Sequence, residues 1–255
     1  MASQNPKGVL LTKIENKIAT LEFGHPASNS FSSDLLNRLT NELQVLSANP
    51  AVSVIVLKSS GTGAFCAGAS FDELLSVTNL AEATEFFSGF ANVINAMRSC
   101  SKIIVGRIHG KAVGGGVGII AACDYVFATF DSSIKLSELS IGIGPFVIEP
   151  AITRKIGKSA MAELALASYE WKDSEWAKNK GLYAKVFAGQ VTLDKELARF
   201  NSELASYNPE ALLEMKTILW EDTENWENLL NERAAISGKL VLSDFTKNAL
   251  RQIKK

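Results

Sequence analysis

The sequence contains few of the residues that build disulfide frameworks or zinc sites. Its 255 residues include only three cysteines and two histidines, and neither their number nor their spacing suits a disulfide-stapled domain or a Cys/His zinc site. There are six prolines and no low-complexity or collagen-like stretch. We therefore expect a cytoplasmic protein with no bound metal, held together by a hydrophobic core rather than by cross-links.

Long apolar runs and an excess of one charge are also missing. The longest apolar and glycine-rich stretch, AVGGGVGIIAAC, has only twelve residues, which is too short to cross a membrane. The first residues, MASQNPKGV, lack the basic and apolar segments of a signal peptide. Lys and Arg total 26 against 27 Asp and Glu, so no basic field favours nucleic acid. We expect neither a membrane nor a nucleic-acid partner.

The hydrophobic pattern of the first two-thirds predicts an α/β fold. Residues 9–23 form two apolar runs around a turn at 15–17, which is typical of a hairpin. After it, a buried-strand pattern followed by a glycine-rich turn and a helical pattern occurs twice, at 52–98 and again from residue 102. Strands that alternate with helices in this way indicate a largely parallel sheet.

The last third of the sequence is mostly helical in pattern. From Ala151 onward only a short strand at 183–187 interrupts it, and three helical stretches follow. These stretches contain three aromatic residues that we expect to be exposed, namely Trp220, Trp226 and Phe245. No linker separates two independent domains, and at roughly 100–200 residues per domain the length fits one large domain with at most a small appendage.

Two glycine-rich loops, at 61–70 and 111–118, each lie between a predicted strand and a predicted helix. Neither has the Gly-Lys-Ser/Thr of a P-loop. Gly116, Gly118 and Ala121 fit a dinucleotide fingerprint only formally, because the preceding strand is separated from them. Backbone N–H groups at such junctions can bind a phosphate or stabilise an oxyanion, although small residues there can also serve close packing alone.

Four segments together resemble the crotonase superfamily, which includes enoyl-CoA hydratases and isomerases. They are FCAGASFDEL, IHGKAVGGGVGIIAACDYVFAT, LSELSIGIGP and WAKNKGLYAKVF. The resemblance implies a crotonase-like (ClpP/crotonase) fold of repeated ββα units in residues 1–195 and a helical trimerisation region in residues 196–255, assembled as a homotrimer or a dimer of trimers. It also implies an acyl-CoA substrate of fatty-acid or branched-chain amino-acid breakdown, with coenzyme A as part of the substrate and no further cofactor.

The resemblance assigns roles to particular residues. The backbone N–H groups of Ala69 and Gly115 would hold the thioester oxygen and stabilise the enolate-like state that forms during the reaction. Glu138, in SELSIGIGP, would be the general acid/base. Relatives that hydrate their substrate use a further glutamate at the position of Gly118, so this glycine favours double-bond isomerisation, in which one carboxylate takes a proton and returns it.

Three further residues would contact CoA if the resemblance extends to its binding site. Ala67 lies in the first loop, while Phe245 and Lys247 would contact the adenine and 3′-phosphate end, often across a subunit interface. Helix packing and a solvated lysine are an equally good interpretation of that last pair.

Two other hypotheses stay open. Glu149 directly precedes Pro150 at the start of a predicted helix, where it could interact with the helix dipole or act as a second acid/base. With Glu138 it would then make the chain an enoyl-CoA or methylglutaconyl-CoA-like hydratase. The other hypothesis is a non-catalytic acyl-CoA-binding protein. From the residues alone, a solvated surface position is the better interpretation of Glu138, and only the resemblance reverses it.

Overall fold

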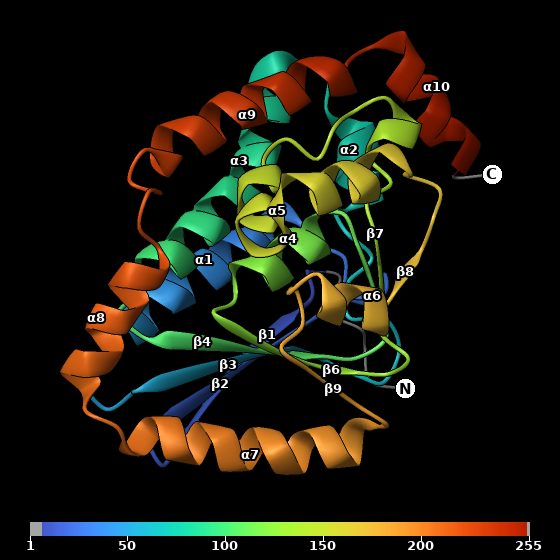
Figure 1. The fold of residues 1–255 in the computed structure, drawn as a ribbon. Coiled ribbons are helices and arrows are strands. Elements are labelled where there is room, and N and C mark those ends of the chain that lie inside the picture. Colours follow the sequence, from blue (N-terminus) through green and yellow to red (C-terminus); the bar gives the residue numbers. More distant parts are fainter. Residues whose placement is uncertain (1–6, 254–255) are drawn as a thin grey trace, which may run out of the picture.

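The computed structural model describes residues 7–253, which are built around a six-stranded sheet (Figure 1). The strand order is β1-β2-β3-β4-β6-β9; β1 is antiparallel to β2, and the other neighbouring pairs are parallel. These strands are β1 Val9–Glu15, β2 Ile18–Gly24, β3 Val54–Ser59, β4 Ile103–Ile108, β6 Tyr125–Thr129 and β9 Lys185–Phe187. A smaller sheet pairs β5 Lys111–Val113 with β7 Ser133–Lys135 in parallel, and β7 with β8 Lys172–Asp173 in antiparallel.

Helices cover both faces of the large sheet. In Figure 1, α7 lies against one face, while α1, α3, α4, α5 and α9 gather on the other. The helices are α1 Ser33–Ala48, α2 Phe71–Ser76, α3 Leu80–Ser99, α4 Gly115–Ala122, the 3-10 turn η1 Leu139–Ile141, α5 Glu149–Leu166, α6 Ser174–Asn179, α7 Gln190–Ser206, α8 Pro209–Leu219, α9 Trp226–Val241 and α10 Asp244–Ile253. The predicted helix at 71–98 is therefore two helices, α2 and α3.

The side chains of β3 explain the layers, because successive residues of a strand point to opposite faces. Val54 and Val56 pack in a cluster with Leu193 of α7. Ile55 and Leu57 belong to the larger cluster on the opposite face. Burial on both faces is what the continuous apolar run of this strand predicted, and it is typical of a parallel sheet.

The turn between β1 and β2 confirms the predicted hairpin. Asn16 and Lys17 both have positive φ angles, of 51° and 64°, and Glu15 pairs with Ile18 across the turn. A two-residue turn of this kind matches the right-handed twist of the strands that it joins.

The number of C-terminal helices differs from the sequence prediction. Within residues 7–253, four helices rather than three follow β9. α7 and α8 are separated at Asn208, whose side chain accepts hydrogen bonds from the backbone N–H groups of Glu210 and Ala211. Pro209 then occupies the first position of α8, where its missing N–H has no cost.

The prediction that Trp220 and Trp226 are exposed is wrong. They are only 5% and 6% exposed, whereas Phe245 is 67% exposed. The indole N–H of Trp220 donates to Asp124 Oδ1 over 2.7 Å, and the two tryptophan rings meet edge to face with centroids 5.8 Å apart. A partner 96 positions away thus lets a polar-tipped aromatic residue be buried.

The C-terminal helices pack on the core. At Gly238 of α9, an added Cβ would lie 2.9 Å from the backbone nitrogen of Thr84 in α3, so the two helices touch at their backbones. The expected boundary between residues 195 and 196 falls within α7 and stays a prediction, as does trimerisation. The two predicted regions begin at residue 1 and end at residue 255, and residues 1–6 and 254–255 lie outside the described range.

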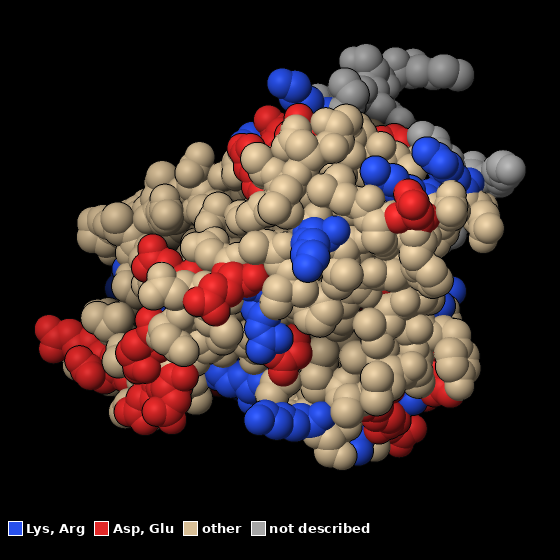
Figure 2. Space-filling view, turned by 90° about the horizontal axis from the view of Figure 1, so that it is seen from above, with Lys and Arg blue, Asp and Glu red and all other residues tan. Residues whose placement is uncertain are grey.

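The surface on the side of α9 and α10 is largely uncharged. Lys and Arg occur there in small separate groups, and acidic residues form their largest group toward the lower left, with smaller groups elsewhere (Figure 2). Between residues 7 and 253, no helix has the length and apolar character needed to cross a membrane.

Candidate active site

The two glycine-rich loops run side by side. Cys66 donates its backbone N–H to Lys111 O over 3.2 Å, and Val113 donates to Cys66 O over 2.9 Å, which makes a short parallel bridge between Cys66 and Ala112. Gly68 has a φ of +90°, and a Cβ there would lie 3.2 Å from Val113 O. Only glycine suits this conformation, so the sequence of the first loop allows its close approach to the second.

The amides of Ala69 and Gly115 are left without a protein acceptor. Around Ala69, Phe31 donates to Gly68 O and Ser70 donates to Phe31 O, each over 2.8 Å, so the intervening amide is not used. Gly115 is the first residue of α4, where the N–H has no intrahelical acceptor. Within the described part of the chain, the amide of Ala69 donates no backbone hydrogen bond, and that of Gly115 donates none outside α4. Both residues line one cavity.

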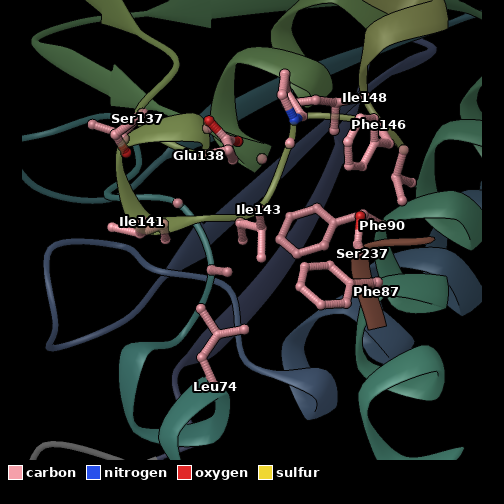
Figure 3. A pocket seen from close by; sticks show the side chains of 18 of the residues that line it. Leu74, Phe87, Phe90, Ser137, Glu138, Ile141, Ile143, Phe146, Ile148 and Ser237 are labelled. Atoms are coloured by element: carbon pink, nitrogen blue, oxygen red, sulfur yellow. The ribbon is translucent and has the colours of Figure 1, made fainter. Parts of the chain in front are cut away.

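Glu138 lines the same cavity and directly precedes η1 (Figure 3). Its Oε2 is fully buried, with no hydrogen-bond partner among residues 7–253. Burial raises the pKa of this carboxyl from 4.5 to about 7, because desolvation penalises the charged form. A carboxyl with a pKa near neutrality can both accept and return a proton at physiological pH.

Gly114 and Gly115 place the reactive groups around one turn. At Gly114, where φ is +53°, a Cβ would lie 2.6 Å from Glu138 Oε1. At Gly115 a Cβ would lie 2.2 Å from the ring of Phe90. The missing side chains therefore make room for the carboxyl on one side of the turn and for an aromatic wall on the other.

An apolar residue fills the space that a side chain at position 118 would need. A Cβ at Gly118 would lie 2.4 Å from Cγ2 of Ile148, and Ile148 lines the cavity next to the start of α5. Glu138 is the single carboxylate among the lining residues that the structure describes.

The rest of the cavity is almost entirely apolar. Its wall includes Phe87 and Phe90 from α3, Leu74 from α2, and the segment that leads into α5 (Figure 3). The twenty lining residues are Ala67, Gly68, Ala69, Phe71, Leu74, Phe87, Phe90, Val113, Gly114, Gly115, Ser137, Glu138, Ile141, Ile143, Gly144, Pro145, Phe146, Val147, Ile148 and Ser237. Such a wall suits an acyl chain, and its few polar groups fix orientation.

Ala67, Ala69, Gly115 and Glu138 thus come together, whereas Glu149 does not join them. Ala67 is exposed at the cavity. Glu149 accepts a hydrogen bond from the hydroxyl of Thr153 over 2.6 Å, one turn along its own helix, and is not among the lining residues.

Phe245 and Lys247 also lie outside the lining. Phe245 is exposed but packs against Gly142, where a Cβ would lie 2.4 Å from its ring. Lys247 is half-buried on α10.

The sequence reasoning missed Ile148 and Ser237. Ile148 carries no motif, and Ser237 comes from a helix whose packing could not be read from its spacing. Over residues 7–253, no cluster of three His, Cys, Asp or Glu side chains could hold a metal ion.

Comparisons with known proteins show the family of the chain. A family model described as enoyl-CoA hydratase/isomerase matches residues 13–251. The peroxisomal Delta(3,5)-Delta(2,4)-dienoyl-CoA isomerase of Arabidopsis thaliana is 26% identical, with 98% of this chain and 94% of that protein covered. A probable enoyl-CoA hydratase of Bacillus subtilis (strain 168) is 24% identical, with 93% and 92% covered.

The solved structures confirm the expected fold. The crystal structure of enoyl-CoA hydratase from Bacillus halodurans has a TM-score of 0.89 at 20% identity, and the match covers 95% of this chain and 99% of that one. A putative enoyl-CoA hydratase from Mycobacterium avium paratuberculosis K-10 has a TM-score of 0.86 at 25% identity, with 96% of each chain covered. Because the family model spans nearly the whole chain and the fold agrees, the chain belongs to the enoyl-CoA hydratase/isomerase family and is an enzyme of the crotonase superfamily.

Proposed function

We propose that this enzyme moves a double bond in an enoyl-CoA, with Glu138 as its general acid/base. The observation that carries the proposal is that Glu138 is the single carboxylate among the described lining residues, while Ile148 fills the space next to Gly118. Hydration of a double bond needs one group to activate water and a source for the proton that is added. Isomerisation needs one group that takes a proton and gives it back.

The proposed reaction conserves its protons. The Glu138 carboxylate removes a proton from C2 of a 3-enoyl thioester, and the electron pair moves to the thioester oxygen, giving a dienolate. The amides of Ala69 and Gly115 donate to that oxygen; loss of one such donor typically costs about 10²–10³ in rate. The protonated Glu138 then delivers the proton to C4, and the double bond ends between C2 and C3.

Rates with three thioesters test the proposal. Purified protein is given cis-3-, trans-3- and trans-2-enoyl-CoA, and the conjugated thioester and the hydrated product are followed separately. We expect migration from the 3-enoyl substrates, a loss of about 10²–10⁴-fold in Glu138→Gln, and little change in Glu149→Gln. Rapid hydration of trans-2-enoyl-CoA without double-bond migration would overturn the assignment, and loss of that hydration in Glu149→Gln would establish the two-carboxylate hydratase instead.

We further propose that the chain assembles as a homotrimer or a dimer of trimers. Large apolar side chains of α8 are exposed in the single chain: Leu213, Ile218 and Leu219 are 41%, 55% and 43% exposed. Exposed apolar groups of this kind mark surfaces that associate. In such an assembly, α10 could bring Phe245 and Lys247 to the CoA of a neighbouring subunit. Sedimentation equilibrium at micromolar concentration tests this proposal, and a monomer would refute it.

A further inference from the structure

Ser237 is a polar side chain of the cavity that the proposed reaction does not use. Among the lining residues that the structure describes, Ser137, Glu138 and Ser237 have polar side chains and the others do not. The first two are neighbours at the reacting end. Ser237 comes from α9 and is 1% exposed. Among the described residues, no hydrogen bond of its hydroxyl is found, and its oxygen is not one of the fully enclosed atoms without a partner, so it borders the open space of the cavity.

Packing holds Ser237 on the side of the cavity away from Glu138. In Figure 3, Ser237 lies beside the rings of Phe90 and Phe87, across the cavity from Glu138. The next residue, Gly238, brings the backbone of α9 against α3, the helix that supplies both rings. Because α9 is packed against α3, the hydroxyl of Ser237 cannot move far to find another partner.

An unpartnered buried hydroxyl can be satisfied by a ligand atom, since a serine both donates and accepts. We propose that Ser237 selects substrates whose acyl chain carries a neutral oxygen, a hydroxyl or a keto group, at the end remote from the thioester. The inference rests on the proposed function, because it takes the cavity as the acyl site. It gives that site a preference for oxygenated enoyl-CoA thioesters.

The charge of the wall decides between a neutral oxygen and a carboxylate. None of the described lining residues is Lys, Arg or His. A carboxylate at the remote end would be buried without a cation, in a cavity that already holds Glu138, and an unpaired buried charge is far more costly than an unpaired dipole. A hydroxyl or keto oxygen needs only the one hydrogen bond that Ser237 offers.

Binding of saturated thioesters tests the inference without any reaction. Pentanoyl-CoA, 5-hydroxypentanoyl-CoA and glutaryl-CoA place a methyl group, a neutral oxygen and a carboxylate at the same end. Their Kd values are measured by titration calorimetry with the wild type, Ser237→Ala, Ser237→Thr and Asn231→Ala. The last variant truncates an exposed polar residue of the same helix and serves as the matched control.

We expect the wild type and Asn231→Ala to prefer the hydroxylated thioester over pentanoyl-CoA by about fivefold, the effect of one hydrogen bond. Ser237→Ala should lose the preference, Ser237→Thr should keep it, and glutaryl-CoA should gain nothing in any variant. An equal preference in Ser237→Ala, or none in the wild type, overturns the role of Ser237. Failure of all three thioesters to bind refutes the acyl-CoA site itself, whereas failure of isomerisation alone leaves this preference intact.

Discussion

Replacing Glu138 by glutamine should stabilise the folded protein at about pH 8 and change its stability much less at about pH 5. Burial raises the pKa of the Glu138 carboxyl from 4.5 to about 7. Above that pKa the carboxyl is charged in the folded and the unfolded protein alike, and the folded protein bears the cost of a buried charge. Glutamine has nearly the same shape and carries no charge at any pH.

The sign and size of the effect follow from proton binding. Folded Glu138 keeps its proton up to about pH 7, whereas the unfolded carboxyl loses it near 4.5. The stability of the wild type therefore falls as pH rises through this window and is constant on either side. At about 1.4 kcal/mol per pH unit the full loss is about 3 kcal/mol, of which about 2.5 kcal/mol falls between pH 5 and pH 8.

Urea unfolding measures this difference directly. The free energy of unfolding of the wild type and of Glu138→Gln is determined at several pH values between about 5 and 8, at one protein concentration because assembly would shift apparent stability. Groups that titrate in both proteins cancel in the difference. Glu232→Gln, at an exposed position of α9, is the matched control and should show no such trend. A gap between wild type and Glu138→Gln that does not widen with pH would refute the burial of this carboxyl.

Two further predictions concern the pH dependence of the reaction and the stability contribution of a buried ion pair. The kcat/KM for a 3-enoyl-CoA should rise about tenfold per pH unit below pH 7 and level off above it, because only the carboxylate form of Glu138 can take the proton; a flat profile would exclude Glu138 as the base. Lys216→Met should lower the free energy of unfolding by about 3–5 kcal/mol, because Lys216 Nζ lies 2.7 Å from Asp124 Oδ2 and both side chains are 3% exposed. Urea titration at neutral pH measures this loss, and a change below about 1 kcal/mol would contradict it.

Sequence reasoning was most successful where the chemistry is local. The hairpin turn and the glycine-rich loops depend on backbone conformations that few residues adopt, so they can be recognised from the sequence. Ala69, Gly115 and Glu138 were named because each lies in a segment with a recognisable pattern, and the structure places all three at one cavity. Their catalytic roles stay a proposal.

The features that escaped prediction depend on partners far away in the chain. From the residues alone, Glu138 is interpreted as a surface residue. In the structure, the loop at Gly114 and the apolar wall bury its carboxyl. Trp220 was predicted to be exposed because the acceptor of its indole N–H, Asp124, is 96 positions away in the sequence. Ser237 lies on a helix whose apolar positions give no sign of a cavity, and only the contact of α9 with α3 shows which face is turned inward.

The missing carboxylate at position 118 is coupled to the residue at position 148. A side chain starting from Gly118 would collide with Ile148, and forcing extra atoms into a packed wall typically costs about 1–3 kcal/mol. A second buried carboxylate would also raise the pKa of Glu138 further, because two like charges resist ionisation together. Packing against Ile148 therefore disfavours a second acid at position 118, and without that second charge the pKa of Glu138 stays near neutrality. A lone carboxyl titrating near neutrality is what a reaction requires when the same proton must be removed and returned, and this agreement of packing with acidity supports the proposed isomerisation.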